Sequence, residues 1–397
     1  MLTLYGVGNI VGAGVYVLIG KIAEPAGYLA VAAFLLAALV AFCAALSYAE
    51  LASRFPVSAG VAVYLHEAFR ARRLSTVVGV MLVGAGIVST ATLLKGFAGY
   101  FYQFVTWPQW FSMMLMAIIL VTIMLKGIKE SVGMAALLTI IEVGGLLFLV
   151  GSIFIARPEA AGNFNDGFLA AAGSLDAGMF GGIISAAFLA FYAFVGFEDM
   201  VNIAEEVKQP QRAFPRAILI SMAVVTLLYV LVAVAALGVL APEVIGGSSA
   251  PLADAYRHAT GQNAAVIVAI SLLATLNGVL VNVIMGSRFL YGMGRRGWIP
   301  AWFAKVSGRH VPARGLLLVA GIALGAALWL PIERLAQVAS LLLLGVFLAV
   351  NVSLIIIRRR HDATSRHMRI SPTFLPWLGA VASIGLLIGQ GVVLLII

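Results

Sequence analysis

The sequence predicts an all-α integral membrane protein with about eleven transmembrane helices. Of the 397 residues, 62% are hydrophobic and only 10% are charged, whereas a soluble domain carries about 25% charged residues. Long apolar runs alternate with short charged hinges, a pattern typical of helical spans and not of a transmembrane barrel. No stretch is long and polar enough for a soluble domain, so we expect one transporter domain over residues 1–397.

A helix needs about 20 apolar residues to cross the hydrocarbon core of a bilayer. Eleven runs meet or approach this length: 3–22, 27–52, 75–104, 111–126, 131–156, 179–204, 214–240, 263–294, 312–330, 332–357 and 374–396. The fourth run is short and the third and eighth are long, and tilting of the helices absorbs such differences.

Lysine and arginine gather in alternate loops. Twenty of the 25 lie at 54–73, 126–129, 208–216, 288–314 and 358–369, and the other loops hold only Lys21, Arg157, Arg257 and Arg334. Cytoplasmic loops carry such an excess, so we expect a multi-pass protein of the cell (inner) membrane with a cytoplasmic N-terminus. The net charge of +9 then reflects topology, and the expected partners are the lipid bilayer and a small molecule, with no nucleic acid.

Two runs are interrupted at corresponding places. The first contains Gly12 and Gly14 in "GNIVGAGVY", and the sixth reads "AFYAFVGFEDM", with Gly196 followed by Glu198 and Asp199 at membrane depth. Paired interruptions in the two halves of a chain are typical of inverted-repeat transporters and indicate the binding site. Each interrupted run opens a series of five, so we expect one repeat at 3–156, a second at 179–357, and an extra helix at 374–396.

An interrupted helix exposes main-chain N–H and C=O groups, each of which costs several kcal/mol if it stays unpaired in hydrocarbon. A helix that resumes near Gly14 offers N–H groups to a carboxylate, and helices that end near Ile10 and Phe194 offer carbonyls to an ammonium group or a cation. An α-amino acid carries both groups, so we expect main-chain recognition of an amino acid, with Gly12, Ala13 and Gly14 allowing close approach. Alternatively, these glycines only let helices pack closely.

Four motifs occur in order along the chain: "GNIVGAGVYVL", "LSYAELASRFPVSAG", "AFVGFEDMVNIAEEVKQPQRAFPRAI" and "GSRFLYGMGRRGWIP". They resemble the first, second, sixth and eighth helix signatures of the amino acid–polyamine–organocation (APC) superfamily. The resemblance implies a LeuT-like fold with a five-plus-five inverted repeat and broken helices 1 and 6. It also implies that Ile10 and Val195 offer carbonyls to the amine, that Ala13 and Gly14 offer N–H groups to the carboxylate, and that Tyr192 is an aromatic gate.

Further polar and aromatic side chains are candidates for binding and coupling. Glu142 lies near the middle of the fifth run, where the resemblance places a lysine in many proton-coupled members. We expect Glu142 to exchange a proton or coordinate a monovalent cation; alternatively, it stays neutral and hydrogen-bonds to the first helix. Asn277 is a candidate substrate contact or an interhelical hydrogen bond. We expect Glu198 to brace or gate the interruption, and Tyr192 and Phe194 to close over the substrate.

These features together predict a secondary active transporter that moves an amino acid by alternating access, with proton-coupled symport as the first expectation. An exchanger without ion coupling and a polyamine or organocation permease are alternatives of the same class, and a receptor or a channel would belong to other classes. The sequence contains no catalytic motif, metal-ligand pair or phosphate-binding loop, so we expect neither an enzyme nor a cofactor other than the coupling ion. The mainly apolar pocket favours a neutral amino acid.

Overall fold

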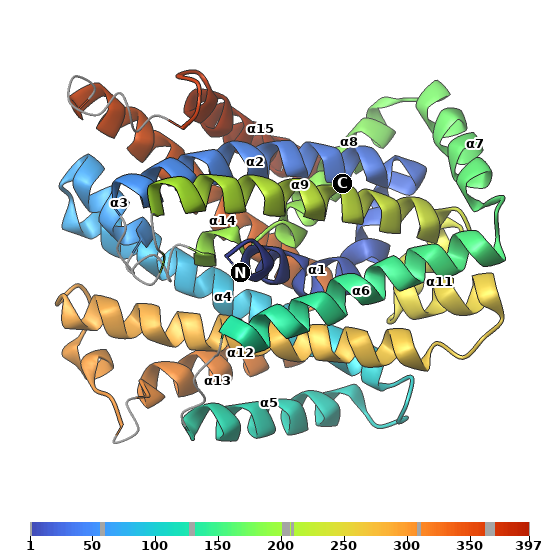
Figure 1. The fold of residues 1–397 in the computed structure, drawn as a ribbon, viewed down its shortest axis with the longest axis horizontal. Coiled ribbons are helices and arrows are strands. Elements are labelled where there is room, and N and C mark those ends of the chain that lie inside the picture. Colours follow the sequence, from blue (N-terminus) through green and yellow to red (C-terminus); the bar gives the residue numbers. More distant parts are fainter. Residues whose placement is uncertain are drawn as a thin grey trace.

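The computed structural model describes residues 2–55, 60–126, 132–200, 207, 210–307, 311–361 and 370–396. Every regular element within these ranges is a helix (Figure 1). The eleven predicted runs correspond to α1 (Leu2–Ala26), α2 (Ala30–Arg54), α4 (Arg72–Phe101), α5 (Gln109–Leu125), α6 (Val132–Ala156), α8 (Ala177–Ala193), α9 (Pro210–Leu237), α12 (Ala265–Arg295), α13 (Ala313–Trp329), α14 (Ile332–His361) and α15 (Leu375–Ile396). Eight described stretches are long and apolar enough to cross a membrane, and three apolar helices are shorter. The predicted all-α membrane fold is confirmed.

Short helices that the sequence analysis does not predict lie at the ends of the bundle: α3 (Gly60–Phe69), α7 (Ala160–Gly173), α10 (Pro242–Gly247), α11 (Pro251–Thr260) and the 3-10 turns η1 (Gly27–Leu29) and η3 (Ala301–Ala304). They are too short or too polar to be found by a search for spanning runs. We call the end that holds α3, η3 and the start of α4 the basic end, at the left of Figure 1, and the end with α7 and α11 the opposite end.

The first helices of the two predicted halves, α1 and α8, pack against each other inside the bundle. Helices α2 and α9 pack against α1 or α8 on one side, and α4 and α12 pack together on the other. Helix α5 lies at the edge of the bundle beside α4 and α13, and α15 packs against α14, α2 and α8. This arrangement places α1, α4, α8 and α12 around one central volume. The division into repeats at 3–156 and 179–357 stays a prediction.

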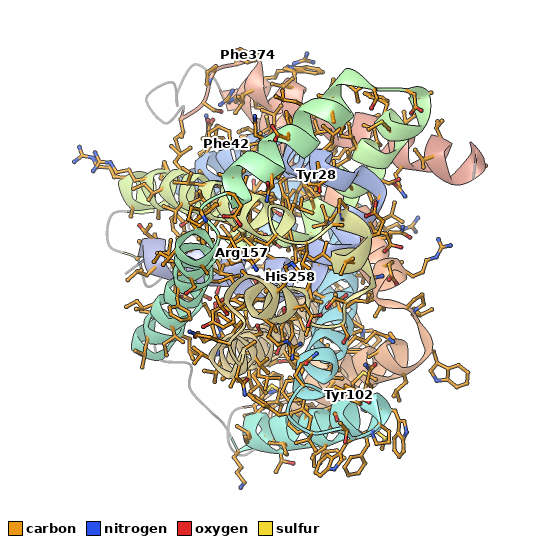
Figure 2. All side chains as sticks on the ribbon, turned by 90° about the vertical axis from the view of Figure 1, so that its right-hand side faces the viewer. Tyr28, Phe42, Tyr102, Arg157, His258 and Phe374 are labelled. Atoms are coloured by element: carbon orange, nitrogen blue, oxygen red, sulfur yellow. The ribbon has the colours of Figure 1, made fainter. Side chains whose placement is uncertain are left out.

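Apolar side chains cover the outside of the bundle. Figure 2 looks along the helices from the opposite end and shows Phe374 at the top of the molecule and Tyr102 in its lower part. Both side chains are exposed, as are Ile155 and Trp329. In the same view Arg157 and His258 lie near each other, where Arg157 Nε donates to the main-chain oxygen of Ala259 at 3.3 Å. An apolar exposed surface of this extent fits a protein whose solvent is lipid.

Local sequence explains where α8 begins and ends. The side chain of Asp176 caps its N-terminus by accepting the main-chain N–H of Met179 at 2.7 Å. At the other end, the N–H groups of Phe194 and Val195 donate to carbonyls three residues earlier, at 3.1 and 3.2 Å, which tightens the last turn. Gly196 then adopts a φ of +128°, and the chain leaves the helix inside the bundle.

Candidate functional site

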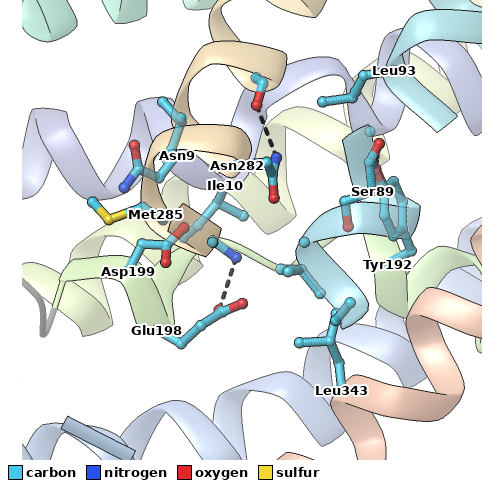
Figure 3. A pocket seen from close by; sticks show the side chains of 18 of the residues that line it. Asn9, Ile10, Ser89, Leu93, Tyr192, Glu198, Asp199, Asn282, Met285 and Leu343 are labelled. Atoms are coloured by element: carbon cyan, nitrogen blue, oxygen red, sulfur yellow. Dashed lines mark hydrogen bonds between the residues drawn. The ribbon is translucent and has the colours of Figure 1, made fainter. Parts of the chain in front are cut away.

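The predicted interruption of the sixth run is confirmed at Ala193–Gly196. A Cβ atom at Gly196 would overlap the carbonyl oxygen of Asn9, and its φ of +128° disfavours any side chain. The N–H of Gly196 donates to Oε2 of Glu198 at 2.8 Å (Figure 3). Glu198 is buried, so its carboxylate satisfies a main-chain donor that the interruption frees. Glu198 therefore lies where it can brace the interruption, and its role in transport stays a prediction.

The predicted interruption of the first run is wrong for this structure, because α1 is continuous from Leu2 to Ala26. A glycine costs a helix interior only about 1 kcal/mol relative to alanine, whereas each main-chain group left unpaired in hydrocarbon costs several kcal/mol. Residues 2–20 contain no aspartate or glutamate that could brace a break. Gly12 and Ala13 lie within this helix, and the structure describes only their backbone.

A cavity of about 80 Å³ lies where α1 and α8 cross (Figure 3). One water molecule needs about 10–15 Å³ of cavity volume, so this cavity has room for several groups of that size. Its lining comes from five helices and the segment after α8, and includes Asn9, Ile10, Gly14, Leu82, Gly86, Ser89, Leu93, Tyr192, Val195, Gly196, Glu198, Asp199, Asn277, Asn282, Met285, Phe289 and Leu343. The structure therefore brings together seven of the predicted site residues: Ile10, Gly14, Tyr192, Val195, Gly196, Glu198 and Asn277.

Phe194 does not line the cavity, contrary to the prediction that it closes over the substrate. Its ring is fully buried and packs against the rings of Tyr229 and Phe34, with centroids 5.2 and 6.4 Å away. Residues two apart on a helix point in nearly opposite directions, about 200° around the axis. Because Tyr192 faces the cavity, Phe194 must face away.

The cavity has a polar wall and a largely apolar wall. Asn9, Glu198 and Asp199 lie on one side in Figure 3, and Nδ2 of Asn9 has no hydrogen-bond partner among the described residues. Leu93 and Leu343 lie on the other side, together with Ser89 and Tyr192, whose hydroxyl donates to the carbonyl of Ser89 at 3.4 Å. This division suits a ligand with one charged end and one apolar end.

Asn9 and the lining of α4 were missed by the sequence analysis. Asn9 stands inside the quoted glycine motif, so its polarity in an apolar run was an available signal. The α4 residues Leu82, Gly86, Ser89 and Leu93 carry no such signal, because they resemble any other residues of a spanning helix.

Another missed residue, Tyr229 on α9, links the two crossing helices. Its buried hydroxyl lies 2.8 Å from the carbonyl oxygens of both Ile10 and Ala193, and 3.3 Å from that of Val11. A hydroxyl has one hydrogen to donate, so these carbonyls share it. Ala193 is the last residue of α8, so no further helical turn supplies an N–H donor to its carbonyl.

Glu142 lies behind the cavity wall. Its Oε1 accepts from Nδ2 of Asn277 at 3.2 Å, so Asn277 both lines the cavity and makes the interhelical hydrogen bond that was its alternative role. The main-chain oxygen of Glu142 accepts from the hydroxyl of Tyr16 on α1 at 2.8 Å. Glu142 is buried, and its Oε2 has no partner within the described ranges. Glu142 thus contacts α1 through its main-chain oxygen and α12 through its carboxyl group, which keeps one open oxygen.

Metal binding finds no support in the part of the chain that the structure describes, since no group of three or more His, Cys, Asp or Glu side chains is placed to hold an ion.

Comparison with known proteins gives one consistent result. The sequence model described as "Amino acid permease" matches residues 2–397. The chain is 28% identical over 390 residues to the branched-chain amino acid permease BcaP of Bacillus subtilis (strain 168), covering 92% of this chain and 81% of that protein. It is 29% identical over 384 residues to the vacuolar cationic amino acid transporter 4 of Arabidopsis thaliana, covering 90% and 62%.

It is also 32% identical over 324 residues to an uncharacterized transporter of Mycobacterium tuberculosis (strain ATCC 25618 / H37Rv), covering 80% of this chain and 70% of that protein. These matches agree with the resemblance of the four motifs and with the multi-pass helical fold. The chain belongs to the amino acid permease family of the APC superfamily, whose named relatives are transporters and not enzymes.

Proposed function

We propose that the chain is a secondary active transporter that moves an amino acid across the cell membrane by alternating access, with the substrate bound in the cavity between α1 and α8. The observation that carries this proposal is the cavity at the α8 interruption, where a helix end, buried polar side chains and an apolar wall meet. The basic end faces the cytoplasm in this proposal, because the lysine and arginine bias assigns it there.

The substrate ammonium group binds at the C-terminal end of α8. The carbonyls of the last turn carry the negative end of the helix dipole, and the Glu198 carboxylate lies beside them. The substrate carboxylate binds the N–H groups of Ala13 and Gly14, which requires α1 to open at Gly12–Gly14. Two glycines lower the cost of that opening, and the Tyr229 hydroxyl already offers the carbonyl of Ile10 a second donor.

The substrate side chain faces the apolar wall of α4 and α14, so a neutral aliphatic amino acid is the proposed cargo. The name of the Bacillus relative, a branched-chain amino acid permease, supports this choice. A cationic amino acid is the second candidate, because two carboxylates, Glu198 and Asp199, line the cavity and the Arabidopsis relative is named a cationic amino acid transporter.

Uptake into proteoliposomes of purified protein separates these candidates. With radiolabelled L-leucine and L-arginine as probes, we expect leucine to accumulate and unlabelled leucine to compete at lower concentration than arginine. Preferential accumulation of arginine would establish the second candidate. Binding of either amino acid without accumulation would contradict the transporter proposal and indicate a receptor.

Glu142 is the proposed coupling residue, and a proton is the proposed coupling ion. A proton on the open Oε2 would change the charge of a carboxyl group that accepts from Asn277 on α12, in a residue whose main-chain oxygen accepts from Tyr16 on α1. Glu142→Gln retains the size and the oxygen that Asn277 reaches, so we expect it to abolish stimulation of leucine uptake by an inward proton gradient and to leave leucine counterflow within about threefold of wild type. Gradient-stimulated uptake equal to wild type would exclude the proton role, and counterflow without any gradient effect in wild type would indicate an exchanger.

A further inference from the structure

The corner where α12 joins α13 concentrates positive charge, and the segment of chain that forms this junction contains no acidic residue. No aspartate or glutamate occurs between Asp254 and Glu333. The 3-10 turn η3 (Ala301–Ala304) folds back on the end of α12, where a Cβ at Gly294 would lie 2.9 Å from the main-chain nitrogen of Ala304. Figure 1 shows this corner at the basic end. We name the corner by its cations: Arg72, Arg295, Arg296, Lys305 and Arg314.

Two of these guanidinium groups lie over indole rings. Arg296 Cζ is 5.3 Å from the ring centroid of Trp298, and Arg314 Cζ is 5.0 Å from that of Trp302. Arg314 Nη1 also donates to the main-chain oxygen of Trp302 at 3.1 Å. Such stacking holds a planar guanidinium in place and leaves N–H groups on its edge able to donate.

Side chains from neighbouring elements extend the corner. The ring of His66 on α3 lies 6.2 Å from that of Trp298, and Arg72 Nη2 would be 3.9 Å from a Cβ at Gly297. Glu67 on α3 is the acidic residue adjacent to His66 in sequence, and it is exposed. None of the five cations of the corner makes an ion pair with a described residue, whereas Glu50 at the same end pairs with both Arg54 and Arg358.

We propose that this corner binds the phosphate headgroup of an anionic phospholipid from the surrounding leaflet. Phosphate oxygens accept several charge-assisted hydrogen bonds at once from fixed guanidinium groups. Tryptophan prefers the headgroup level of a bilayer, and Trp302 is exposed beside its arginine. The excess of lysine and arginine that orients a membrane protein depends only on the number of charges. It does not explain why two guanidinium groups are stacked on indole rings. Because α12 carries Asn277 and Asn282 into the cavity, lipid at its end stabilises the helix that lines the site.

Thermal unfolding of the purified full chain in a neutral detergent tests this proposal. We expect phosphatidylglycerol to raise the unfolding midpoint by several degrees relative to phosphatidylcholine, and Arg296→Gln with Arg314→Gln to remove at least two thirds of that rise. The matched control is Arg212→Gln with Arg216→Gln, which removes two exposed arginines at the start of α9, at the same end of the bundle. The control should keep the rise. Equal losses in both double variants, or no loss in the first, would overturn the proposal.

Two further measurements identify the ligand and test the proposal if the glutamine variant does not fold. Inorganic phosphate at the same phosphorus concentration should leave the midpoint unchanged, and a rise equal to that with phosphatidylglycerol would replace the lipid by a soluble anion. If the glutamine pair does not fold in phosphatidylcholine, Arg296→Lys with Arg314→Lys keeps the charge but loses the planar stack. This lysine pair should retain less than half of the rise, and full retention would contradict a site built on guanidinium groups.

Discussion

Helices α1 and α8 cross at the cavity and each has a glycine-containing motif there, yet only α8 is interrupted. In α8, Gly196 has a positive φ and the carboxylate of Glu198 binds the freed N–H. In α1, Gly12 and Gly14 stay within a continuous helix, and residues 2–20 contain no carboxylate. Glycine therefore permits an interruption at membrane depth, but a buried acceptor or donor stabilises one. In the proposed function, α8 therefore binds the ligand as it stands, whereas α1 must first open.

The largest expected effect is at Gly196, where the interruption depends on the backbone. In Gly196→Ala, the new Cβ would overlap the carbonyl of Asn9 and force a side chain into a positive φ, which costs of order 1–3 kcal/mol before the overlap is counted. We expect leucine uptake to fall below about a tenth of wild type. Gly144→Ala on α6 is the control, because its Cβ would enter open space. Normal uptake by Gly196→Ala would show that the α8 interruption is not needed.

Removing the brace should have the next largest effect. Glu198→Ala leaves the Gly196 N–H without its acceptor, and an unpaired buried donor costs about 1–3 kcal/mol. We expect a lower unfolding midpoint and weaker uptake. Glu198→Gln keeps an oxygen for the N–H, so it should retain most of the stability. Identical midpoints for the two variants would argue that Glu198 does not stabilise the interruption.

Loss of the hydroxyl that joins the two helices should have a smaller effect. Tyr229→Phe keeps the ring against Phe34 and Phe194 but removes the donor shared by Ile10 and Ala193. A typical hydrogen bond contributes about 0.5–1.5 kcal/mol, so we expect a midpoint decrease of a few degrees and a two- to tenfold change in uptake.

The control for that hydroxyl is Tyr256→Phe, whose hydroxyl donates to Gln262 away from the cavity. Its uptake should stay near wild type. Equal uptake changes in the two tyrosine variants would mean that the hydroxyl between α1 and α8 has no special role.

The sequence was sufficient for the helices and for the interruption of α8. Apolar runs of spanning length have few alternatives in a membrane, and carboxylates directly after Gly196 indicated a break. The sequence was insufficient for α1. Whether a helix opens at a pair of glycines depends on which hydrogen-bonding groups surround it in the folded protein, and the sequence does not show these. The sequence does not place Phe194 correctly, because residues two apart on a helix point in nearly opposite directions and closeness to Tyr192 in sequence does not imply a shared face. Tyr229 was missed because a tyrosine in an apolar run gives no sign of which carbonyls it reaches.

The central claim is that main-chain groups at the crossing of α1 and α8 hold the two charged ends of the substrate. The most direct measurement is a cryo-EM structure of the full chain in lipid nanodiscs with saturating L-leucine, or with L-arginine should that be the transported amino acid. We expect the ammonium group at the end of α8, and the carboxylate within hydrogen-bond distance of the N–H groups of Ala13 or Gly14 in an opened α1. An amino acid bound with α1 still continuous through Gly12–Gly14, or bound outside this cavity, would contradict the account.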